Sequence, residues 1–489
     1  MTPGLSDVRT EDGLNRGEQH GRPSPWSIGR DQLAVGGVLL ITLLAYLKCL
    51  GNPFTLDDHL FLENALIGQW SFLSRSLTKD LLWFLDATGG PISPYYRPLL
   101  LIVLGLEYHL FGHNPTAFHA TPLMLHLLVV WLVYKLATRL TGDRYAALLA
   151  ALLFGLTPVH AEAVLSIAAT NYPLCAALQL AAFYLIMQQA GTKRGVGFLS
   201  LGLYVGALLC HESAVVFPAL VALYVLLLEP APVAHIDDSI LACASLQLKR
   251  ALVRAAPFLA AVIVYAGFRV FVLHLSMRTS NPGQEVNGAT VLLTLPRVVI
   301  TYVVLMVVPW MAGDSDRVPF ARSATSPDFY LAVATLIALA GCFYVGLRNH
   351  PRRRLYLFCV LWAALGIAPM MNLRGLWPQG EIANRYFYLP SVGWCVMVAD
   401  WAVHLARSGT QARRLVWVGT ASVLVVCLAV LMNLQSLWHD EVALIEGRLE
   451  RYPESAYCHY ALSRALMERG DVAGAERERE IAAKLPVGN

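Results

Sequence analysis

The segment "DQLAVGGVLLITLLAYLKCLGNPFTLDDHLFL", residues 31–62, joins a membrane-length apolar run to a pair of acids. A transmembrane helix needs roughly 20 apolar residues, and the run from 31 to 50 reaches that length. Asp57 and Asp58 follow shortly afterwards, and no Lys or Arg lies within seven residues of the pair. A turn explains one acid, whereas two adjacent acids at the mouth of a membrane segment indicate a chemical role.

The composition extends this interpretation to the whole chain. The protein is 56% hydrophobic and 14% charged, with a mean hydropathy of +0.53. Soluble domains average about 25% charged residues, so we expect an all-α polytopic membrane protein embedded in a lipid bilayer. The net charge of +4 gives no reason to propose a nucleic-acid partner. The nine cysteines are scattered, mostly in apolar runs, and predict neither disulfides nor a metal site.

The N-terminal residues, 1–30, are polar and predict a disordered cytoplasmic tail. They contain no pattern of a cleavable signal peptide. The apolar run that follows is long enough to remain as a membrane anchor.

Apolar runs recur along the chain at lengths that span, or nearly span, a membrane. They cover residues 31–50, 116–138, 145–158, 161–189, 196–211, 213–229, 255–275, 329–347, 355–371, 386–405 and 415–433. Two further apolar pieces, 97–111 and 296–310, are shorter. Length alone therefore does not fix the number of spans.

Basic residues decide between the alternatives, because Lys and Arg concentrate in cytoplasmic loops. Such clusters are Arg139 and Arg144, Lys193 and Arg194, Lys249, Arg250 and Arg254, "RNHPRRR" at 348–354, and Arg407, Arg413 and Arg414. About eleven spans place all of them, with the N-terminal tail, on one side, and we prefer this count. The two short pieces are then interfacial or re-entrant helices. If both cross instead, about thirteen spans result and the first three clusters change side.

With eleven spans, residues 31–433 form a transmembrane domain with two large external loops, 51–115 and 276–328, and residues 434–489 are external. The unusual polar residues then gather at the external face, where several lie at helix ends. They are Asp57 and Asp58, Arg97 in "YYRPLL", His160 and Glu162 in "TPVHAEAV", His211 and Glu212 in "CHES", Arg269, and Glu381 and Arg385 in the last external loop. Ionisable residues at membrane depth are costly and therefore indicate function.

A lipid-phosphate-linked sugar fits this set of residues. Its phosphate would lie at the interface, where the candidate ligands are Arg385, Arg97 and Arg269, since a guanidinium binds two phosphate oxygens and stays charged. A carboxylate near the anomeric carbon would act as general base on an acceptor hydroxyl. Asp58 is slightly preferred over Asp57, and either could instead hold a divalent metal ion.

Structural roles are the alternative for each of these residues. The acidic pair could cap the next helix, and the arginines could extend to the lipid headgroups. His160 and Glu162 could hydrogen-bond within their own turn. Tyr386 and Tyr388 are typical of aromatic residues at a membrane interface.

A family resemblance rests on motifs in a fixed order. These are "NPFTLDDHLFLEN", "YYRPLL", "FGHNPTAFHATPLMLHLL", "PVHAEAV", "HESAVVFPALVALY" and "NRYFYLPSVG", followed by a C-terminal helical repeat. From about residue 45 onward the chain resembles the transmembrane and tetratricopeptide-repeat O-mannosyltransferases and their bacterial relatives. The resemblance implies a GT-C-like bundle, a polyprenyl- or dolichyl-phosphate sugar donor, an acceptor protein or glycan, and a catalytic acidic motif at Asp57 and Asp58.

The sequence departs from the family pattern at several positions. The family's His-Pro-x-His-Thr-Glu has Thr157 and Ala161 here, with His160 and Glu162 kept. The Gly-Arg that follows is Ala169-Thr170, the Lys-Glu is His211-Glu212, and the Asp-Asn-Pro is Ser280-Asn281-Pro282. The sugar and the acceptor are therefore left open.

The C-terminal segment "PESAYCHYALSRALMERGDVAGAERERE" predicts two helices with a turn at Gly470-Asp471. Its length is close to one tetratricopeptide repeat of about 34 residues. One repeat does not bury its own core, so we expect this hairpin to pack on the membrane domain or on a partner. The preceding "EVALIEGRLERYP" is expected to supply an additional packing helix.

The sequence thus favours a membrane glycosyltransferase that moves a sugar, mannose by resemblance, to a hydroxyl acceptor such as protein Ser or Thr. The active site would face the periplasm from a bacterial inner membrane, or the lumen of the endoplasmic reticulum in a eukaryote. Two alternatives remain. A transporter would carry its charges near mid-membrane on two repeated halves, and no internal repeat is evident. A non-catalytic scaffold would use the C-terminal hairpin for docking.

Overall fold

The computed structural model describes residues 25–85, 93–188, 194–230, 240–275, 288–313, 315–318, 320–321, 323, 326–371 and 381–485. The described part of the chain is almost entirely helical, as the apolar periodicity predicts. Residues 1–24, most of the predicted N-terminal tail, lie outside the described residues, and residues 25–30 already belong to the first helix.

The first half of the membrane domain alternates long helices with short 3-10 turns, labelled η. Its elements are α1 (Pro25–Tyr46), η1 (Leu47–Gly51), α2 (Asp57–Leu62), α3 (Trp70–Ser76), η2 (Trp83–Leu85), α4 (Pro98–Phe111), α5 (Pro115–Thr141), α6 (Arg144–Leu156), η3 (Pro158–His160), α7 (Ala161–Leu165), η4 (Ile167–Ala169), α8 (Asn171–Gln188), α9 (Arg194–Cys210), η5 (Glu212–Val216) and α10 (Phe217–Leu227).

The second half adds a two-stranded ribbon and the C-terminal helices. Its elements are α11 (Ile240–Gly267), the π-helical turn η6 (Phe268–Val272), α12 (Gly288–Val307), η7 (Pro309–Met311), β1 (Ser315–Arg317), α13 (Pro327–Leu347), α14 (Arg353–Ile367), η8 (Ala368–Met371), β2 (Glu381–Ala383), η10 (Asn384–Phe387), α15 (Ser391–Ala406), α16 (Thr410–Trp438), α17 (Glu441–Arg451), α18 (Ala456–Glu468) and α19 (Val472–Lys484).

Among the described residues, eight helices are long and apolar enough to cross a membrane, or nine if the bent pair 144–156 and 158–165 is one span. Four shorter apolar helices, including α4 and α15, have 10–17 residues. The protein is therefore an integral, multi-pass membrane protein with the all-helical architecture predicted from its sequence. The count of eleven spans stays a prediction.

Three predicted boundaries differ from the structure. The 296–310 piece is the second half of α12, which has the length of a span, because Pro296 lies inside the helix and does not end it. Apolar helices tolerate such a proline where neighbours satisfy the freed backbone groups. The predicted span 161–189 is broken into α7, η4 and α8. The predicted span 255–275 begins earlier, at Ile240.

The early start of α11 has a physical cause. Its N-terminal half carries basic residues that pair with an acid at the end of the preceding helix. Arg250 and Arg254 lie 3.4 and 3.1 Å from the carboxylate oxygens of Glu229. These contacts extend the helix beyond its apolar part.

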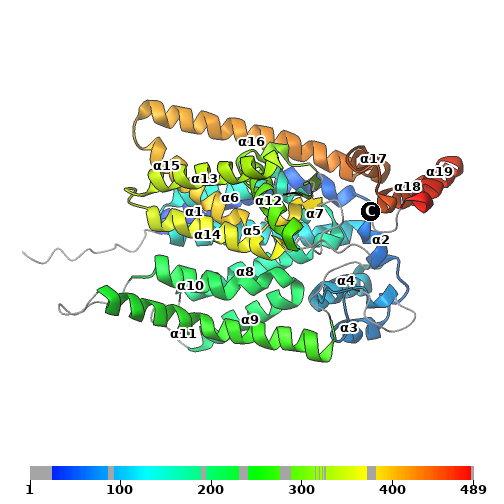
Figure 1. The fold of residues 1–489 in the computed structure, drawn as a ribbon, viewed down its shortest axis with the longest axis horizontal. Helices are drawn as coiled ribbons and strands as arrows, with labels where there is room; N and C mark the ends of the chain where they lie inside the picture. The colour runs from blue at the N-terminus through cyan, green and yellow to red at the C-terminus, as the bar shows by residue number, and fades with distance from the viewer. Residues whose placement is uncertain are drawn as a thin grey trace, which may run out of the picture.

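The main core is formed by side chains of the membrane helices, centred on α5, α6, α8 and α15. A second cluster fills the first external loop, where Phe72, Trp83 and Phe84 pack under Leu104 of α4. The predicted short helix at 97–111 thus covers the aromatic interior of the loop that precedes it. Figure 1 shows α2, α3 and α4 at the same end of the bundle as α17, α18 and α19.

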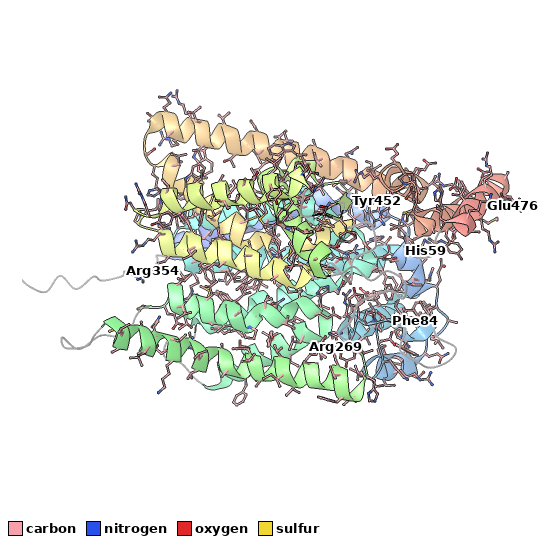
Figure 2. The ribbon with its side chains drawn as sticks, in the orientation of Figure 1. His59, Phe84, Arg269, Arg354, Tyr452 and Glu476 are labelled. Atoms are coloured by element: carbon pink, nitrogen blue, oxygen red, sulfur yellow. The ribbon has the colours of Figure 1, made fainter. Side chains whose placement is uncertain are left out.

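Basic segments predicted to share one membrane side meet at the other end of the bundle. Arg352 donates to the carbonyl oxygen of Thr141 at 3.1 Å, and Arg407 pairs with Asp143 at 2.5 Å. Figure 2 places Arg354 at this end, opposite the external-loop elements. The arrangement agrees with a common side for these loops.

The C-terminal hairpin forms as predicted. Helices α18 and α19 meet at Gly470, whose φ of +82° suits a residue without a Cβ. Capping by Ser455 and Asp471 starts the two helices, since each side chain accepts a hydrogen bond from a backbone N–H of the first turn. The predicted extra helix is α17, and Figure 1 shows all three helices beside α2.

Candidate active site

The acidic pair lies on a tight turn, Thr55–Asp58, between η1 and α2. The Asp58 N–H donates to the Thr55 carbonyl oxygen at 2.9 Å, and Leu56 has φ 50° and ψ −114°. These angles match the first central position of a type II′ turn, which normally carries glycine. A leucine held there costs on the order of 1–3 kcal/mol, so the surrounding contacts must impose the conformation.

Asp58 points inward from this turn and is fully buried. One carboxylate oxygen accepts from the Ala168 N–H at 2.8 Å and the other from the Thr55 N–H at 3.2 Å. Burial raises the pKa of Asp58 to about 7, although the two backbone N–H groups favour its ionised form. Asp58 thus ties the first external loop to the segment that precedes α8.

Asp57 points the other way and is exposed. Its Oδ1 accepts a hydrogen bond from the Tyr457 hydroxyl of α18 at 2.7 Å. Asp57 also contributes to the electrostatic stabilisation of the Arg385 guanidinium. The two adjacent acids therefore occupy opposite environments: Asp58 is buried against backbone N–H groups, whereas Asp57 is exposed and contacts α18.

Arg385 lies on η10 and is held by Glu162 of α7. The Glu162 carboxylate accepts from the Arg385 backbone N–H at 3.0 Å and pairs with its guanidinium. The Arg385 side chain is 31% exposed, whereas that of Glu162 is 3% exposed. Burial opposes the charge of Arg385, but Glu162 raises the pKa of the guanidinium well above its usual range.

Arg97 and Glu212 form a second pair on neighbouring elements. Arg97 Nε lies 3.0 Å from Glu212 Oε2, and the Tyr96 N–H donates to Glu212 Oε1 at 3.1 Å. Burial alone would raise the pKa of Glu212, but Arg97 dominates the opposing charges, which lower it to about 2. The guanidinium of Arg97 also stacks on Tyr95, 4.7 Å from its ring centre.

Tyr172 connects the two pairs. It lies at the start of α8 and interacts electrostatically with both Arg97 and Arg385. Its ring centre is 6.1 Å from that of Tyr386 and 4.5 Å from that of His211. The sequence analysis did not single out Tyr172. The available signal was its position in the first turn of an apolar helix.

Comparisons with known proteins show which family the chain resembles. Residues 94–260 match the family model described as dolichyl-phosphate-mannose-protein mannosyltransferase. The chain is 22% identical over 492 aligned residues to the human protein O-mannosyl-transferase TMTC4. This alignment covers 91% of the present chain and 65% of TMTC4. It is 24% identical over 482 residues to the Caenorhabditis elegans protein O-mannosyl-transferase F38B6.6, covering 95% of this chain and 65% of the relative.

The chain is similar in sequence to these protein O-mannosyltransferases. It spans 65% of the length of these two relatives. The similar solved structures include the oligosaccharyltransferase AglB from Archaeoglobus fulgidus, with 13% identity, a TM-score of 0.47, and coverage of 90% of this chain and 60% of AglB.

The remaining predicted residues lie around the two pairs. His160 is buried and contacts the Phe154 carbonyl oxygen at 2.9 Å and the Ser391 hydroxyl at 2.8 Å. These contacts hold the turn between α6 and α7 on α15. His160 thus occupies a packing position, separate from the exposed side of Asp57.

The last three predicted site residues are His211, Arg269 and Glu381. His211 caps η5 through its Nδ1, which accepts from the Ser213 N–H at 3.1 Å. Arg269, on η6, donates to the Pro94 carbonyl oxygen at 2.5 Å and adds positive charge near Glu212. The Glu381 side chain lies outside the described residues; its backbone pairs with Arg317 in the ribbon.

A small pocket adjoins Tyr172 and Tyr386. Its lining is largely apolar, with Gln179 and Ser213 as polar groups. Helix α8, η8 and the segment before α15 enclose it. The pocket therefore extends from the aromatic side chains near Arg385 into the helical bundle.

The acidic pair does not form a metal site among the described residues. Both Asp58 oxygens are engaged by backbone N–H groups, and the group with metal-ligand spacing consists of His59, Glu63 and Glu468 instead. Hydrogen bonds to Glu441 and Glu63 outweigh burial and raise the pKa of His59 to about 9. No step below uses a metal ion.

Proposed function

We propose that this protein transfers a sugar, mannose by analogy with its relatives, from a polyprenyl- or dolichyl-phosphate donor to a hydroxyl acceptor, such as protein Ser or Thr. The observation that carries the proposal is the position of Asp57. It is the exposed acid of the turn and adds negative charge in the surroundings of Arg385. The basic loops gather at the opposite end of the bundle, which supports a site on the periplasmic or lumenal face.

Asp57 acts as the general base in this proposal. The acceptor oxygen attacks the anomeric carbon and its proton passes to the Asp57 carboxylate. The bond from the anomeric carbon to the phosphate oxygen breaks, and the lipid phosphate leaves with the electron pair. A single displacement of this kind inverts the configuration at the anomeric carbon. Asp58 is unsuited to the role because it is buried and both its oxygens accept backbone hydrogen bonds.

The arginines stabilise the departing phosphate. Arg385 retains 31% of its side-chain exposure, enough for its guanidinium to contact a ligand while Glu162 holds its orientation. Arg97 and Arg269 add positive charge behind it. In this arrangement Glu162 and Glu212 orient arginines and do not touch the sugar.

The test is sugar transfer in purified membranes from radiolabelled polyprenyl-phosphate mannose. Asp57→Asn should lower transfer by roughly 10²- to 10⁴-fold, the usual contribution of a general base, with the melting temperature unchanged. Asp328→Asn, which alters an exposed acid at the start of α13, is the matched control and should keep full activity.

Two outcomes would contradict the proposal. Full transfer by Asp57→Asn would remove Asp57 as the base. No transfer by the wild type, from mannose or from a panel of other lipid-linked sugars, would favour the non-catalytic scaffold instead.

A further inference from the structure

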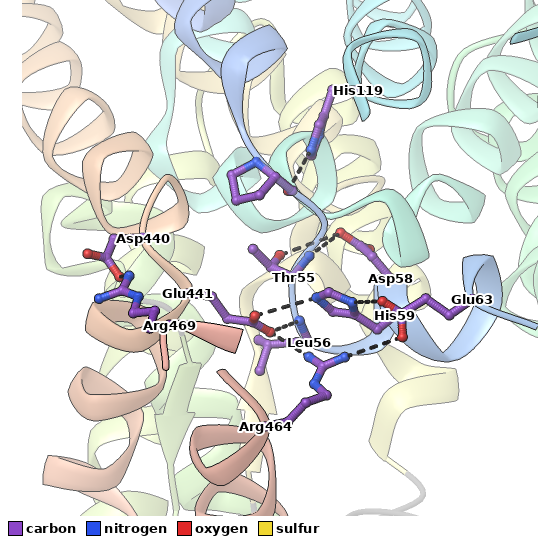
Figure 3. Close-up of polar contacts among 11 residues, drawn as sticks. Thr55, Leu56, Asp58, His59, Glu63, His119, Asp440, Glu441, Arg464 and Arg469 are labelled. Carbon is purple, nitrogen blue, oxygen red and sulfur yellow. Dashed lines mark hydrogen bonds and ion pairs between the residues drawn. The ribbon is translucent and has the colours of Figure 1, made fainter. Parts of the chain in front are cut away.

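The helices that follow the membrane domain hold the backbone of the acidic turn. The strained Leu56 N–H donates to Glu441 Oε1 of α17 at 2.8 Å, a contact across 385 residues. The same carboxylate accepts from Arg464 of α18 at 2.7 Å and lies 3.4 Å from His59. Figure 3 shows Glu441 between Leu56, His59 and Arg464. Burial opposes ionisation of Glu441, but His59 and the Leu56 N–H outweigh it and lower its pKa, so Glu441 is a charged anchor at neutral pH.

Helix α18 also contacts the outward-facing acid itself. The Tyr457 hydroxyl donates to Oδ1 of Asp57 at 2.7 Å. Burial and the adjacent Asp57 carboxylate raise the pKa of Tyr457 well above its usual range, so it remains a hydrogen-bond donor. One oxygen of Asp57 is thereby fixed, which directs the other, Oδ2, towards the acceptor.

A third contact extends the connection towards Arg385. The guanidinium of Arg451, at the end of α17, lies against Gly313, where a Cβ would come within 2.4 Å of it. The Gly313 carbonyl oxygen accepts from the Asn384 side chain at 2.5 Å, and Asn384 immediately precedes Arg385. Helix α17 thus contacts both the turn that carries Asp57 and the segment that is bonded to Asn384, next to Arg385.

We infer that α17 and α18 are part of the catalytic apparatus, with Tyr457 as a positioning residue for Asp57 and Glu441 as the anchor of its turn. This inference rests on the proposed function for its catalytic consequence, but the anchoring of the turn can be tested without activity. The C-terminal hairpin then acts within the same chain, and transfer depends on its being docked.

The first experiment separates positioning from folding in the full-length protein. Tyr457→Phe removes only the hydroxyl and should lower kcat roughly tenfold, as expected for a lost hydrogen bond to a charged group. The KM for polyprenyl-phosphate mannose should stay unchanged, because Tyr457 acts through Asp57 and does not bind the donor. Tyr460→Phe on the same helix, where the side chain is 63% exposed, is the control and should behave as wild type.

A double-mutant cycle sharpens this result. In the Asp57→Asn background, Tyr457→Phe should cause no further loss, since the residue on which it acts is already disabled. Full kcat in Tyr457→Phe, or an independent tenfold loss in the Asp57→Asn background, would overturn the positioning role even if the transferase activity is established.

The second experiment measures the turn directly by hydrogen–deuterium exchange of the peptide covering residues 54–63. Glu441→Ala should accelerate exchange in this peptide, whereas Glu446→Ala, on the exposed side of α17, should not. Glu441→Gln keeps an acceptor oxygen for the Leu56 N–H and should restore slow exchange. Unchanged exchange in Glu441→Ala would overturn the anchoring role. If the wild type transfers no sugar, the proposed function fails while this measurement still decides the anchoring.

Discussion

The two ends of the membrane domain carry ion pairs that are nearly identical in burial. At the external end, Arg385 and Glu162 are 31% and 3% exposed. At the opposite end, Arg352 and Asp400 are 33% and 3% exposed. Each pair therefore combines a partly exposed arginine with a buried acid, and burial alone does not distinguish a functional pair from a structural one.

The neighbours of the two pairs differ. Arg352 also donates to the Thr141 carbonyl oxygen, and Asp400 accepts from Tyr356 at 3.0 Å, so this pair joins three helices. Arg385 instead lies over the Tyr386 ring, and the nearby Asp57 carboxylate adds to the negative charge around it. We expect an ion pair to take part in catalysis when a candidate catalytic group lies near its exposed arginine. Of the two pairs, Arg385–Glu162 has such a group, Asp57, nearby.

The largest difference is expected from removing each arginine. Arg385→Ala and Arg352→Ala both remove the guanidinium that neutralises a buried acid, which costs about 3–5 kcal/mol and lowers the melting temperature in both variants. Transfer per folded molecule should fall roughly 100-fold in Arg385→Ala alone, because a preorganised donor to the leaving phosphate is lost. Equal specific activity in the two variants would remove the distinction between the two ends.

The pH dependence of stability provides a second, smaller test at the external end. The native state holds the Asp58 proton up to about pH 7, whereas an unfolded Asp releases it near pH 3.9. The native state therefore binds more protons at Asp58 between these values, and the contribution of this residue to stability should fall as pH rises from about 4 to 7, by an amount on the order of 4 kcal/mol.

Other buried groups titrate in the same window, so the contribution of Asp58 is isolated by substitution. In melting curves of the detergent-solubilised protein, Asp58→Asn should remove the Asp58 contribution to the pH dependence between pH 4 and 7, whereas Asp57→Asn should leave it in place. An identical pH dependence in Asp58→Asn and in the wild type would contradict a raised pKa at Asp58.

The smallest expected change in stability comes from replacing a turn glycine at each end of the membrane domain. Gly470 joins α18 and α19 with φ +82°, and Gly142 ends α5 with φ +67°. Alanine at either position should cost about 1 kcal/mol through backbone strain, lowering the melting temperature by a few degrees without changing transfer. A large loss of transfer in Gly470→Ala only would assign α19 a role beyond packing on α18.

The sequence predicted the helical membrane architecture and the C-terminal hairpin because both depend on local signals, namely apolar length, periodicity and capping. It also predicted that Arg97, Glu212, Glu162 and Arg385 share one end, since charge patterns assign loops to sides. The pairing of each acid with its arginine depends on how the helices pack. The spacing of these residues along the chain does not indicate the pairing. The catalytic assignments themselves stay predictions.

The preference for Asp58 over Asp57 shows where sequence reasoning stops. Adjacent residues on a turn point in opposite directions, and the direction of each here depends on the unusual conformation of Leu56. That conformation is stabilised by Glu441, a partner 385 residues away. Our proposal of Asp57 as the base therefore rests on side-chain directions that no local pattern contains.

The small ribbon has a mechanical consequence. Strands β1 and β2 pair antiparallel, Ser315 opposite Ala383 and Arg317 opposite Glu381, and between them the chain runs through α13 and α14. The pairing of β1 with β2 therefore holds together the two ends of the segment that contains α13 and α14. A single proteolytic cut in the basic segment 348–352 should leave both halves attached, and any rearrangement of the last external loop should carry α13 and α14 with it as one unit.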